Sequence, residues 1–174
     1  MIDKNSINVV LNTFFDSPTK EFHARELSRK TGLSIFSVLE AIKKLSKEGF
    51  LSVHKKGNMK IVKASNSTKF IRTKRVKNLE KLYELGVVDY LNERYNNPEA
   101  IILFGSYSRG DDVESSDIDM AIITKNHIEH KNILEKFEKM LSRKISLHEI
   151  DFKKISREFH NNIINGIILE GAIS

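Results

Sequence analysis

The stretch LFGSYSRGDDVESSDIDMAII, residues 103–123, is the most informative part of this 174-residue sequence. The run Ala100–Phe104 that leads into it is continuously apolar and of strand length, which predicts a strand covered on both faces. Gly105 and Ser106 follow directly, and a short helical turn then leads to a second glycine. The predicted order is therefore a buried strand, Gly-Ser and a short helix.

Two aspartates open the next predicted strand, which ends at Ile123. Residues two apart on a strand point to the same face, so the carboxylates of Asp117 and Asp119 are expected to project together. Carboxylates this close repel one another unless a cation lies between them, and such hard oxygen ligands suit Mg²⁺. Taken alone, the pair could also be two solubilising carboxylates at the end of a strand.

Residues 103–123 resemble the minimal nucleotidyltransferases of the DNA polymerase beta superfamily. The signature of these enzymes is a strand, Gly-Ser, a short helix with a second glycine, and Ser-Asp-x-Asp opening the next strand. Every part has a counterpart here: Gly105, Ser106, Gly110, Ser116, Asp117 and Asp119. The resemblance implies a small mixed sheet with flanking helices over residues 98–174. It also implies a reaction in which an acceptor hydroxyl attacks the α-phosphate of a nucleoside triphosphate (NTP) and pyrophosphate leaves.

The same resemblance assigns roles to the matched residues. Asp117 and Asp119 would be catalytic and would bind Mg²⁺ or Mn²⁺. The nucleotide site would be formed by the small residues of the motif: Gly105, Ser106, Gly110 and Ser116. Glycine lets the backbone approach a triphosphate closely, and the helix start offers free N–H groups to the same anion. Arg109 is either a further nucleotide contact or a solvated charge at the helix end.

The third carboxylate of this family, which helps to deprotonate the acceptor or completes a second metal site, has no clear counterpart. It belongs on the strand predicted over residues 144–151, where Ile145 and Leu147 are expected to face inward. The acid then falls at Ser146, and a serine is a weak ligand for Mg²⁺. Glu149 is the substitute considered first, provided that the strand bulges or its register differs by one residue.

Two further residues near this strand are candidates. Asp151 is the second acid, although it also resembles the N-cap of a last helix that starts near Phe152. His148 can act as a base or be a hydrogen-bonded strand histidine. Without a third acid, the protein would bind Mg-nucleotide and turn over slowly or not at all.

Charge is distributed unevenly along the chain. Residues 1–77 contain 17 Lys and Arg against 6 Asp and Glu, a net charge of +11, and residues 78–174 contain 12 against 17, a net charge of −5. This indicates two modules with different partners, of which the basic one suits a polyanion such as nucleic acid. A drift in surface charge that only keeps both parts soluble would give the same numbers.

The basic half has the element order of a winged helix-turn-helix. Helical periodicity and turn residues predict three helices and a hairpin, at residues 4–15, 24–30, 35–48, 50–54 and 59–62. The segment from His23 to Ser65 resembles that family, in which the third helix enters the major groove of DNA. Its predicted buried side consists of Val38, Leu39, Ile42 and Leu45. Winged helices also serve as protein docks or dimerisation modules.

The resemblance implies a set of DNA contacts. The outward positions of the third helix would meet the bases: Ser34, Ser37, Ala41 and Lys44. Lys55 and Lys56 at the wing tip would approach phosphates, and the second helix would flank the backbone through Arg25, Arg29 and Lys30. No Arg, Asn or Gln lies on this predicted reading face, so affinity is expected to exceed sequence discrimination. DNA binders of this kind are commonly two-fold dimers, although no interface stripe is visible.

These patterns predict an α+β protein with a winged helix-turn-helix at residues 1–68, a joining helix at 69–97 and a nucleotidyltransferase-like domain at 98–174. The segment 77–95 is expected to be helical with an interruption at Gly86, and a helix is expected around 129–143. The tail 159–171 has apolar spacing for a helix that closes over the sheet. The absence of Cys excludes a disulfide scaffold, and with no membrane span or signal peptide we expect a cytoplasmic protein.

Three functions fit the sequence. The first is a nucleotidyltransferase joined to a DNA-binding module, whose acceptor is a protein of the toxin type, a tRNA end or a small molecule. In the second, a transcription regulator, of the antitoxin type or another type, uses an inactive nucleotidyltransferase-like domain to sense nucleotide or to dimerise. In the third, the basic module recognises the acceptor, which is RNA or an acidic protein.

Overall fold

The computed structural model describes residues 4–125, 128, 134–151 and 157–173. The chain divides into two compact units, Met1–Lys74 and Arg75–Ser174, and the division falls inside one helix, α4 (Thr68–Glu84). Each unit has its own apolar core. Among the described residues, no helix combines the length and the apolar character needed to cross a membrane.

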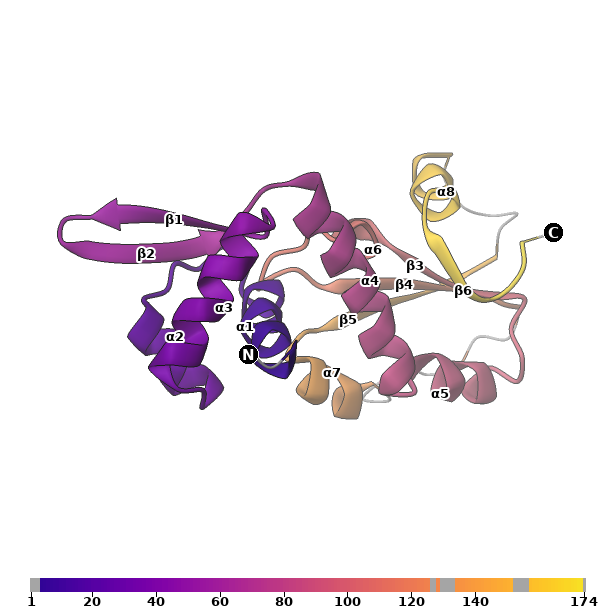
Figure 1. Ribbon diagram of the computed structural model, residues 1–174. Coiled ribbons are helices and arrows are strands. Elements are labelled where there is room, and N and C mark those ends of the chain that lie inside the picture. The colour runs from indigo at the N-terminus through magenta and orange to yellow at the C-terminus, as the bar shows by residue number, and fades with distance from the viewer. Residues whose placement is uncertain (1–3, 126–127, 129–133, 152–156, 174) are drawn as a thin grey trace. The chain divides into compact units, whose positions relative to one another are not determined.

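The N-terminal unit consists of three helices followed by a hairpin, in the order that the sequence predicted (Figure 1). Its elements are α1 (Lys4–Asp16), α2 (Ala24–Thr31), α3 (Ile35–Lys47), β1 (Leu51–Lys56) and β2 (Met59–Ala64). The two strands pair antiparallel, and Phe22 forms an additional bridge with Val62. The first turns of α4 belong to the same core through Phe70, whose ring packs against Phe15 at a centroid distance of 5.1 Å.

The turn between α2 and α3 follows from local chemistry. Gly32 adopts the left-handed conformation with φ of +69°, which ends α2 without the steric cost that a side chain would bring. Ser34 then caps α3, because its hydroxyl accepts a hydrogen bond from the backbone N–H of Ser37 at 3.1 Å.

The buried side of α3 contains different residues from those that the sequence predicted. Leu39 was expected to be buried, but 51% of it is exposed. Ala41 was expected to face DNA, but it is fully buried together with Val38, Ile42 and Leu45. The prediction was wrong because a helix that packs closely against its neighbours accepts a small residue at the contact, and the large residue then lies on the other side.

The C-terminal unit is built around a four-stranded mixed sheet with the strand order β5-β4-β3-β6. The strands are β3 (Ala100–Phe104), β4 (Ile118–Ile123), β5 (Ile145–Ile150) and β6 (Ile167–Gly171). β3 pairs antiparallel with β4 and β6, and β4 pairs parallel with β5. The helices of this unit, besides the end of α4, are α5 (Val87–Arg94), α6 (Gly105–Arg109), α7 (Glu135–Leu141) and α8 (Arg157–Ile164).

Both faces of the sheet are covered. One face carries Ile101 and Leu103 of β3 and packs against α4, α5 and α7, through Leu82, Leu91 and Phe137 respectively. The other face carries Ala100, Ile102 and Phe104 and packs against Ile163 of α8. All five residues of β3 are buried, which confirms the prediction of a strand covered on both faces. We call these the α5 face and the α8 face.

The predicted tail changed its type. The tail was predicted to be helical to residue 171, but the helix ends at Ile164 and β6 pairs with β3 instead. Gly166 makes this turn possible, since a Cβ there would lie 2.7 Å from the carbonyl oxygen of Leu103. Of the helix expected around 129–143, the described residues include α7. The predicted start of that helix at residue 129 lies outside the described residues, and so does Phe152, near which the last helix was predicted to start.

Candidate active site

Asp117 and Asp119 lie where β4 begins, on the α8 face of the sheet. Asp119 is opposite Phe104 of β3 and opposite Ser146 of β5 in the strand register. It alternates with Ile118 and Met120, which both belong to the core on the α5 face. Asp117 is exposed and Asp119 is half-buried. The structure therefore places the two predicted carboxylates on one side of the sheet.

Burial and three neighbouring groups influence the pKa of Asp119. Burial raises this pKa above its ordinary value, and the Asp117 carboxylate raises it further, whereas His148 and Arg109 lower it. The three neighbours come from the start of β4, from β5 and from α6. A half-buried carboxylate next to a second one is costly to ionise, and a bound cation would offset that cost.

Gly105 is packed directly against Asp119. A Cβ at this position would lie 2.2 Å from the Oδ2 atom of Asp119, and the backbone φ of +71° also favours glycine. The hydroxyl of Ser108 donates a hydrogen bond to the carbonyl of Gly105 at 2.8 Å and fixes the turn. Gly110 ends α6 with φ of +82°. The positive φ angles therefore favour glycine at both positions of the motif. The lack of a side chain at Gly105 also leaves space for the Asp119 carboxylate.

A buried ion pair holds the segment between α6 and β4, and the sequence patterns did not indicate it. Arg143 Nη2 lies 3.0 Å from Asp112 Oδ2, with 8% and 0% of the two side chains exposed. Asn78 of α4 donates from Nδ2 to Asp112 Oδ1 at 2.8 Å and to the carbonyl of Tyr107 at 2.9 Å. This network connects α4, α6 and the turn between α7 and β5 within the C-terminal unit.

The same arginine reaches the backbone immediately before Asp117. Arg143 Nη1 donates to the carbonyl of Val113 and, at 2.9 Å, to the carbonyl of Ser116. The Ser116 hydroxyl accepts from the backbone N–H of Val113 at 3.0 Å. Ser116 was predicted to contact nucleotide, and in the structure its hydroxyl shapes the loop. No local signal could have identified Arg143, because it lies 27 residues from Ser116 in the chain.

Ser146, where the resemblance places the third acid, lies opposite Asp119 in the strand register. Its hydroxyl lies 3.5 Å from Asp117 Oδ2, on the same face as the carboxylates. The register between β4 and β5 is continuous from Ile118–Ile145 to Ile123–Ile150, so the bulge that Glu149 would have needed is absent from these strands. Within the described part of the chain, no group of three Asp, Glu, His or Cys side chains could hold a metal ion.

Glu149 belongs to the opposite side of β5. It alternates with Ser146 and His148, which places it on the α5 face. Its Oε1 accepts a hydrogen bond from the backbone N–H of Ile128 at 2.9 Å, and it also hydrogen-bonds the hydroxyl of Tyr95. The structure therefore does not bring Glu149 together with Asp117 and Asp119. Asp151 follows the last residue of β5 and is partly exposed.

Arg109 and His148 lie at the rim of the site. Arg109 is 61% exposed, and its Nε donates to Asp111 Oδ2 at 3.2 Å. The ring of His148 packs against that of Phe104 with centroids 5.7 Å apart. Both lie near enough to Asp119 to lower its pKa.

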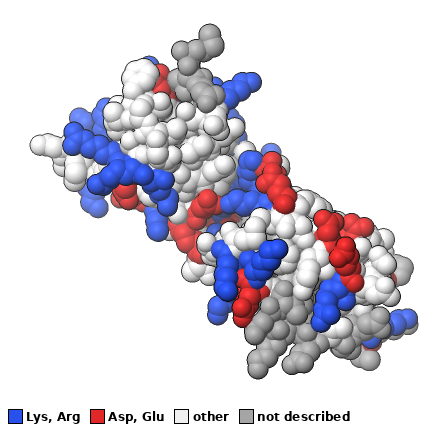
Figure 2. Space-filling view, turned by 90° about the horizontal axis from the view of Figure 1, so that it is seen from below, with Lys and Arg blue, Asp and Glu red and all other residues white. Residues whose placement is uncertain are grey.

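The predicted DNA contacts of the N-terminal unit are mostly exposed side chains. The exposed cations are Arg25, Arg29, Lys30, Lys44, Lys55 and Lys56. Lys and Arg side chains form a blue band over this unit in Figure 2. Ala41 is buried and cannot touch DNA, which corrects that prediction. The hydroxyls of Ser34 and Ser37 lie 2.9 Å apart and bond to each other at the start of α3.

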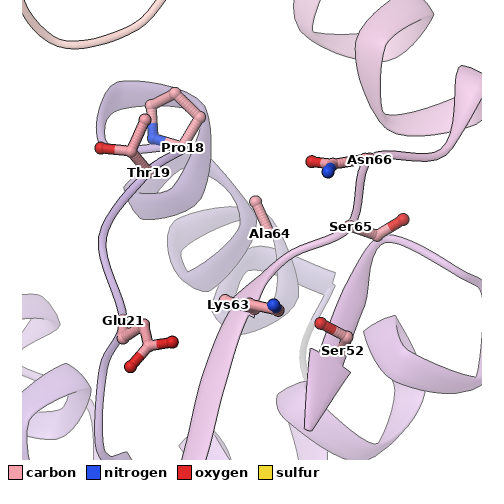
Figure 3. Close-up of a pocket in the computed structure, with 8 residues that line it drawn as sticks. All are labelled: Pro18, Thr19, Glu21, Ser52, Lys63, Ala64, Ser65 and Asn66. Carbon is pink, nitrogen blue, oxygen red and sulfur yellow. The ribbon is translucent and has the colours of Figure 1, made fainter.

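A polar pocket of about 420 Å³ lies at the base of the hairpin in the N-terminal unit (Figure 3). It is lined by Pro18, Thr19, Glu21, Ser52, Lys63, Ala64, Ser65 and Asn66. None of the predicted site residues belongs to this lining. We therefore assign the candidate chemistry to the cluster around Asp119 and not to this pocket.

Comparisons with known proteins found a family match and several similar proteins. Residues 87–173 match the family model described as polymerase beta, nucleotidyltransferase. A candidate protein adenylyltransferase from Methanocaldococcus jannaschii is 34% identical over 83 residues, which cover 44% of this chain and 83% of that protein. A crystal structure of a toxin-antitoxin with AMP-PNP shares 23% identity and a TM-score of 0.43, over 55% of this chain and 74% of that one. A candidate transcriptional regulator from Methanosarcina mazei Go1 shares 21% identity and a TM-score of 0.37, over 53% and 78%.

Proposed function

Because the chain belongs, through residues 87–173, to the polymerase beta nucleotidyltransferase family, we propose that it transfers an adenylyl group from ATP to a hydroxyl group of an acceptor protein. The observation that carries the proposal is the arrangement of Asp117 and Asp119 on one face, with Gly105 packed against Asp119. The similarity to a candidate protein adenylyltransferase supports ATP as donor and protein as acceptor.

The residues present suit a divalent cation. Asp117 and Asp119 offer hard oxygen ligands on one face, and Mg²⁺ is commonly held by one or two carboxylates together with phosphates and water. The raised pKa of Asp119 supports this assignment, because burial and a neighbouring carboxylate disfavour its charge until a cation is bound. When bound, Mg²⁺ or Mn²⁺ would neutralise phosphate charge and polarise the α-phosphate.

The chain's own residues would orient the substrates. The backbone at Gly105 and Ser106 would lie against the triphosphate, since no side chain at Gly105 blocks the approach. The acceptor hydroxyl would form a new oxygen–phosphorus bond at the α-phosphate while the α–β bridging bond breaks. Pyrophosphate would leave with the bonding electron pair, and the hydroxyl proton would pass to water. Arg109 would add positive charge beside the phosphates.

We propose a second role for the N-terminal unit, which is duplex DNA binding by a winged helix-turn-helix. The order of three helices and a hairpin supports this, and so does the net charge of +11 over residues 1–77. Ser146 in place of the third acid favours a variant of this proposal, in which the C-terminal unit senses nucleotide and regulates DNA binding.

The test separates these possibilities in two steps. The melting temperature of the full chain is measured with each of the four NTPs and Mg²⁺, because a ligand that binds the folded state raises it by mass action. We expect ATP to raise it and Asp117→Asn to abolish the shift. Asp89→Asn removes an exposed carboxylate from α5 and is the matched control. The absence of a shift with every NTP would refute the proposal.

The second step measures transfer. Proteins of a cell extract are incubated with the full chain and α-labelled ATP, and labelled proteins are separated on a denaturing gel. The expected result is a labelled protein with the wild type and with Asp89→Asn, but not with Asp117→Asn. A melting shift without any labelled protein would contradict transfer and support the sensing variant.

A further inference from the structure

The outward side of α3 carries large apolar side chains that the core does not use. Phe36 is 71% exposed, Leu39 is 51% exposed and Ile35 is 43% exposed. Lys43 and Lys47 are also exposed and continue the line of Phe36 and Leu39 toward the end of the helix. We call Phe36, Leu39, Lys43 and Lys47 the α3 stripe. Its members are three or four residues apart, which is the spacing of neighbours along one side of a helix.

Folding of the N-terminal unit does not explain this stripe. The helix already contributes Val38, Ala41, Ile42 and Leu45 to the core. Adjacent exposed apolar side chains, as opposed to isolated ones, indicate a surface that binds a partner. Phe36 lies in the first turn of α3, two residues after the Ser34 cap, and Leu39 lies about one turn further along. The apolar part of the stripe is thus at the helix start and the basic part is at its end.

The charges around the stripe indicate its partner. The unit is strongly basic, with 17 Lys and Arg against 6 Asp and Glu over residues 1–77. The polyanion that also offers apolar groups to a helix is duplex DNA, because each thymine exposes a methyl group in the major groove. The first residues of a recognition helix are the ones that contact base edges, and cations further along can reach phosphates.

We propose that α3 enters the major groove and that Phe36 and Leu39 contact thymine methyl groups, while Lys43 and Lys47 contact phosphates. This rests on the proposed DNA-binding role of the N-terminal unit. It differs from the expectation that this helix would discriminate poorly between sequences. Sequence preference here comes from apolar contacts with A·T pairs and needs no Arg, Asn or Gln on the helix.

The test removes the methyl groups and leaves the protein unchanged. Duplexes that bind the full chain are first selected from a pool of random 20-base-pair sequences at a fixed salt concentration. In the tightest duplex, each thymine is then replaced in turn by deoxyuridine, which lacks only the methyl group. We expect selected duplexes to be rich in A·T pairs and each contacted methyl to change the Kd by about fourfold, the value of one buried methylene.

Protein variants assign the effect to the stripe. Phe36→Ala and Leu39→Ala should each abolish the effect of deoxyuridine at the thymine that the removed side chain contacts. Val76→Ala, which removes an exposed valine from α4, should keep the effect at every contacted thymine. Lys43→Ala should weaken binding to every duplex alike and lower the salt slope by about 0.9.

Two results would overturn the proposal. In one, duplexes are selected but deoxyuridine has no effect in the wild type, so DNA binding stands and the apolar readout does not. In the other, no duplex is selected and Phe36→Ala reduces transfer to a labelled acceptor, which assigns the stripe to a protein partner. Adenylyl transfer is measured in parallel with the same preparations, so failure of this proposal is distinguishable from failure of the proposed catalytic function.

Discussion

The two units of this protein expose their functional groups in opposite ways. In the C-terminal unit, buried polar contacts hold the candidate site. An example is the pair of Asp112 and Arg143, whose side chains are 0% and 8% exposed, respectively. In the N-terminal unit, the candidate contacts are exposed cations and exposed apolar side chains on α3. A reaction requires fixed distances between atoms, whereas a docking surface requires access.

The largest effect is expected at Asp119, the half-buried carboxylate of the proposed active site. Asp119→Asn should lower adenylyl transfer by at least about 1,000-fold, because the metal contributes several kcal/mol to the transition state. Initial rates with α-labelled ATP would measure this. A residual rate within tenfold of the wild type would mean that Asp119 does not hold a metal.

The same variant should be more stable than the wild type. The folded-state pKa of Asp119 is raised, so the folded protein binds this proton more tightly than the unfolded chain does, and the carboxylate destabilises the fold increasingly as the pH rises through that pKa. Asp119→Asn removes this cost. Its melting temperature should therefore exceed that of the wild type at pH 7 without metal, and the difference should shrink as the pH falls toward 4.

The next effect compares a buried ion pair with an exposed one. Arg143→Met leaves the buried Asp112 carboxylate without its cation and should cost about 3–5 kcal/mol of unfolding free energy. Arg109→Met breaks an exposed pair with Asp111 and should cost less than about 1 kcal/mol. Urea denaturation monitored by circular dichroism would measure both. Equal losses would show that the buried network does not hold the loop before β4.

Ser146→Asp would supply a carboxylate at the position where the sequence resemblance places the third acid. The new group would lie near Asp117, since the Ser146 hydroxyl is 3.5 Å from Asp117 Oδ2. If the missing acid limits proton removal from the acceptor, transfer should rise by up to about 100-fold. Ser115→Asp, in the exposed loop before Asp117, is the control and should leave the rate unchanged. Equal rates for the wild type and both variants would argue against that limit.

Gly105 and Gly57 have similar positive φ angles, so substituting each of them distinguishes a loss of stability from a loss of activity. Gly105→Ala and Gly57→Ala both place a side chain at positive φ, +71° and +61°, and each should cost about 1–2 kcal/mol of stability. Nothing lies within 4 Å of a Cβ at Gly57, whereas the one at Gly105 meets Asp119. Only Gly105→Ala should therefore lose transfer, measured at a temperature where both variants are folded.

The smallest effect on catalysis is expected at Glu149. Glu149→Gln should change adenylyl transfer by less than about twofold, because this side chain bonds Ile128 and Tyr95 on the α5 face. Loss of the charged acceptor should lower stability by about 1–2 kcal/mol. A large loss of transfer in a variant that stays folded would place Glu149 back in the catalytic group.

How far the sequence predicted the structure depended on the range of the contacts involved. The site around Gly105 and Asp119 could be predicted because a few neighbouring residues in one motif determine it. The pairing of Asp112 with Arg143 could not, because these residues are far apart in the chain and neither shows a pattern. On α3, Leu39 and Ala41 both fit a buried position, and only the packing of neighbouring helices selects the smaller residue.

The tail was mispredicted for a similar reason. Ile163 and Ile164 continue at helical spacing into Ile167 and Ile168, so the periodicity favours one long helix. What ends the helix is the close approach of Gly166 to β3, and this tertiary contact leaves no local signal beyond the glycine itself.

The strand order β5-β4-β3-β6 has a consequence for synthesis on the ribosome. β3 is the first strand of the sheet to emerge and is apolar throughout, yet its partner β6 ends only at Gly171, 67 residues after Phe104. At about 5–20 residues per second, one edge of this strand stays unpaired for roughly 3–13 seconds in every nascent chain. An apolar strand left open for that time is a target for chaperones and for aggregation between neighbouring chains on a polysome.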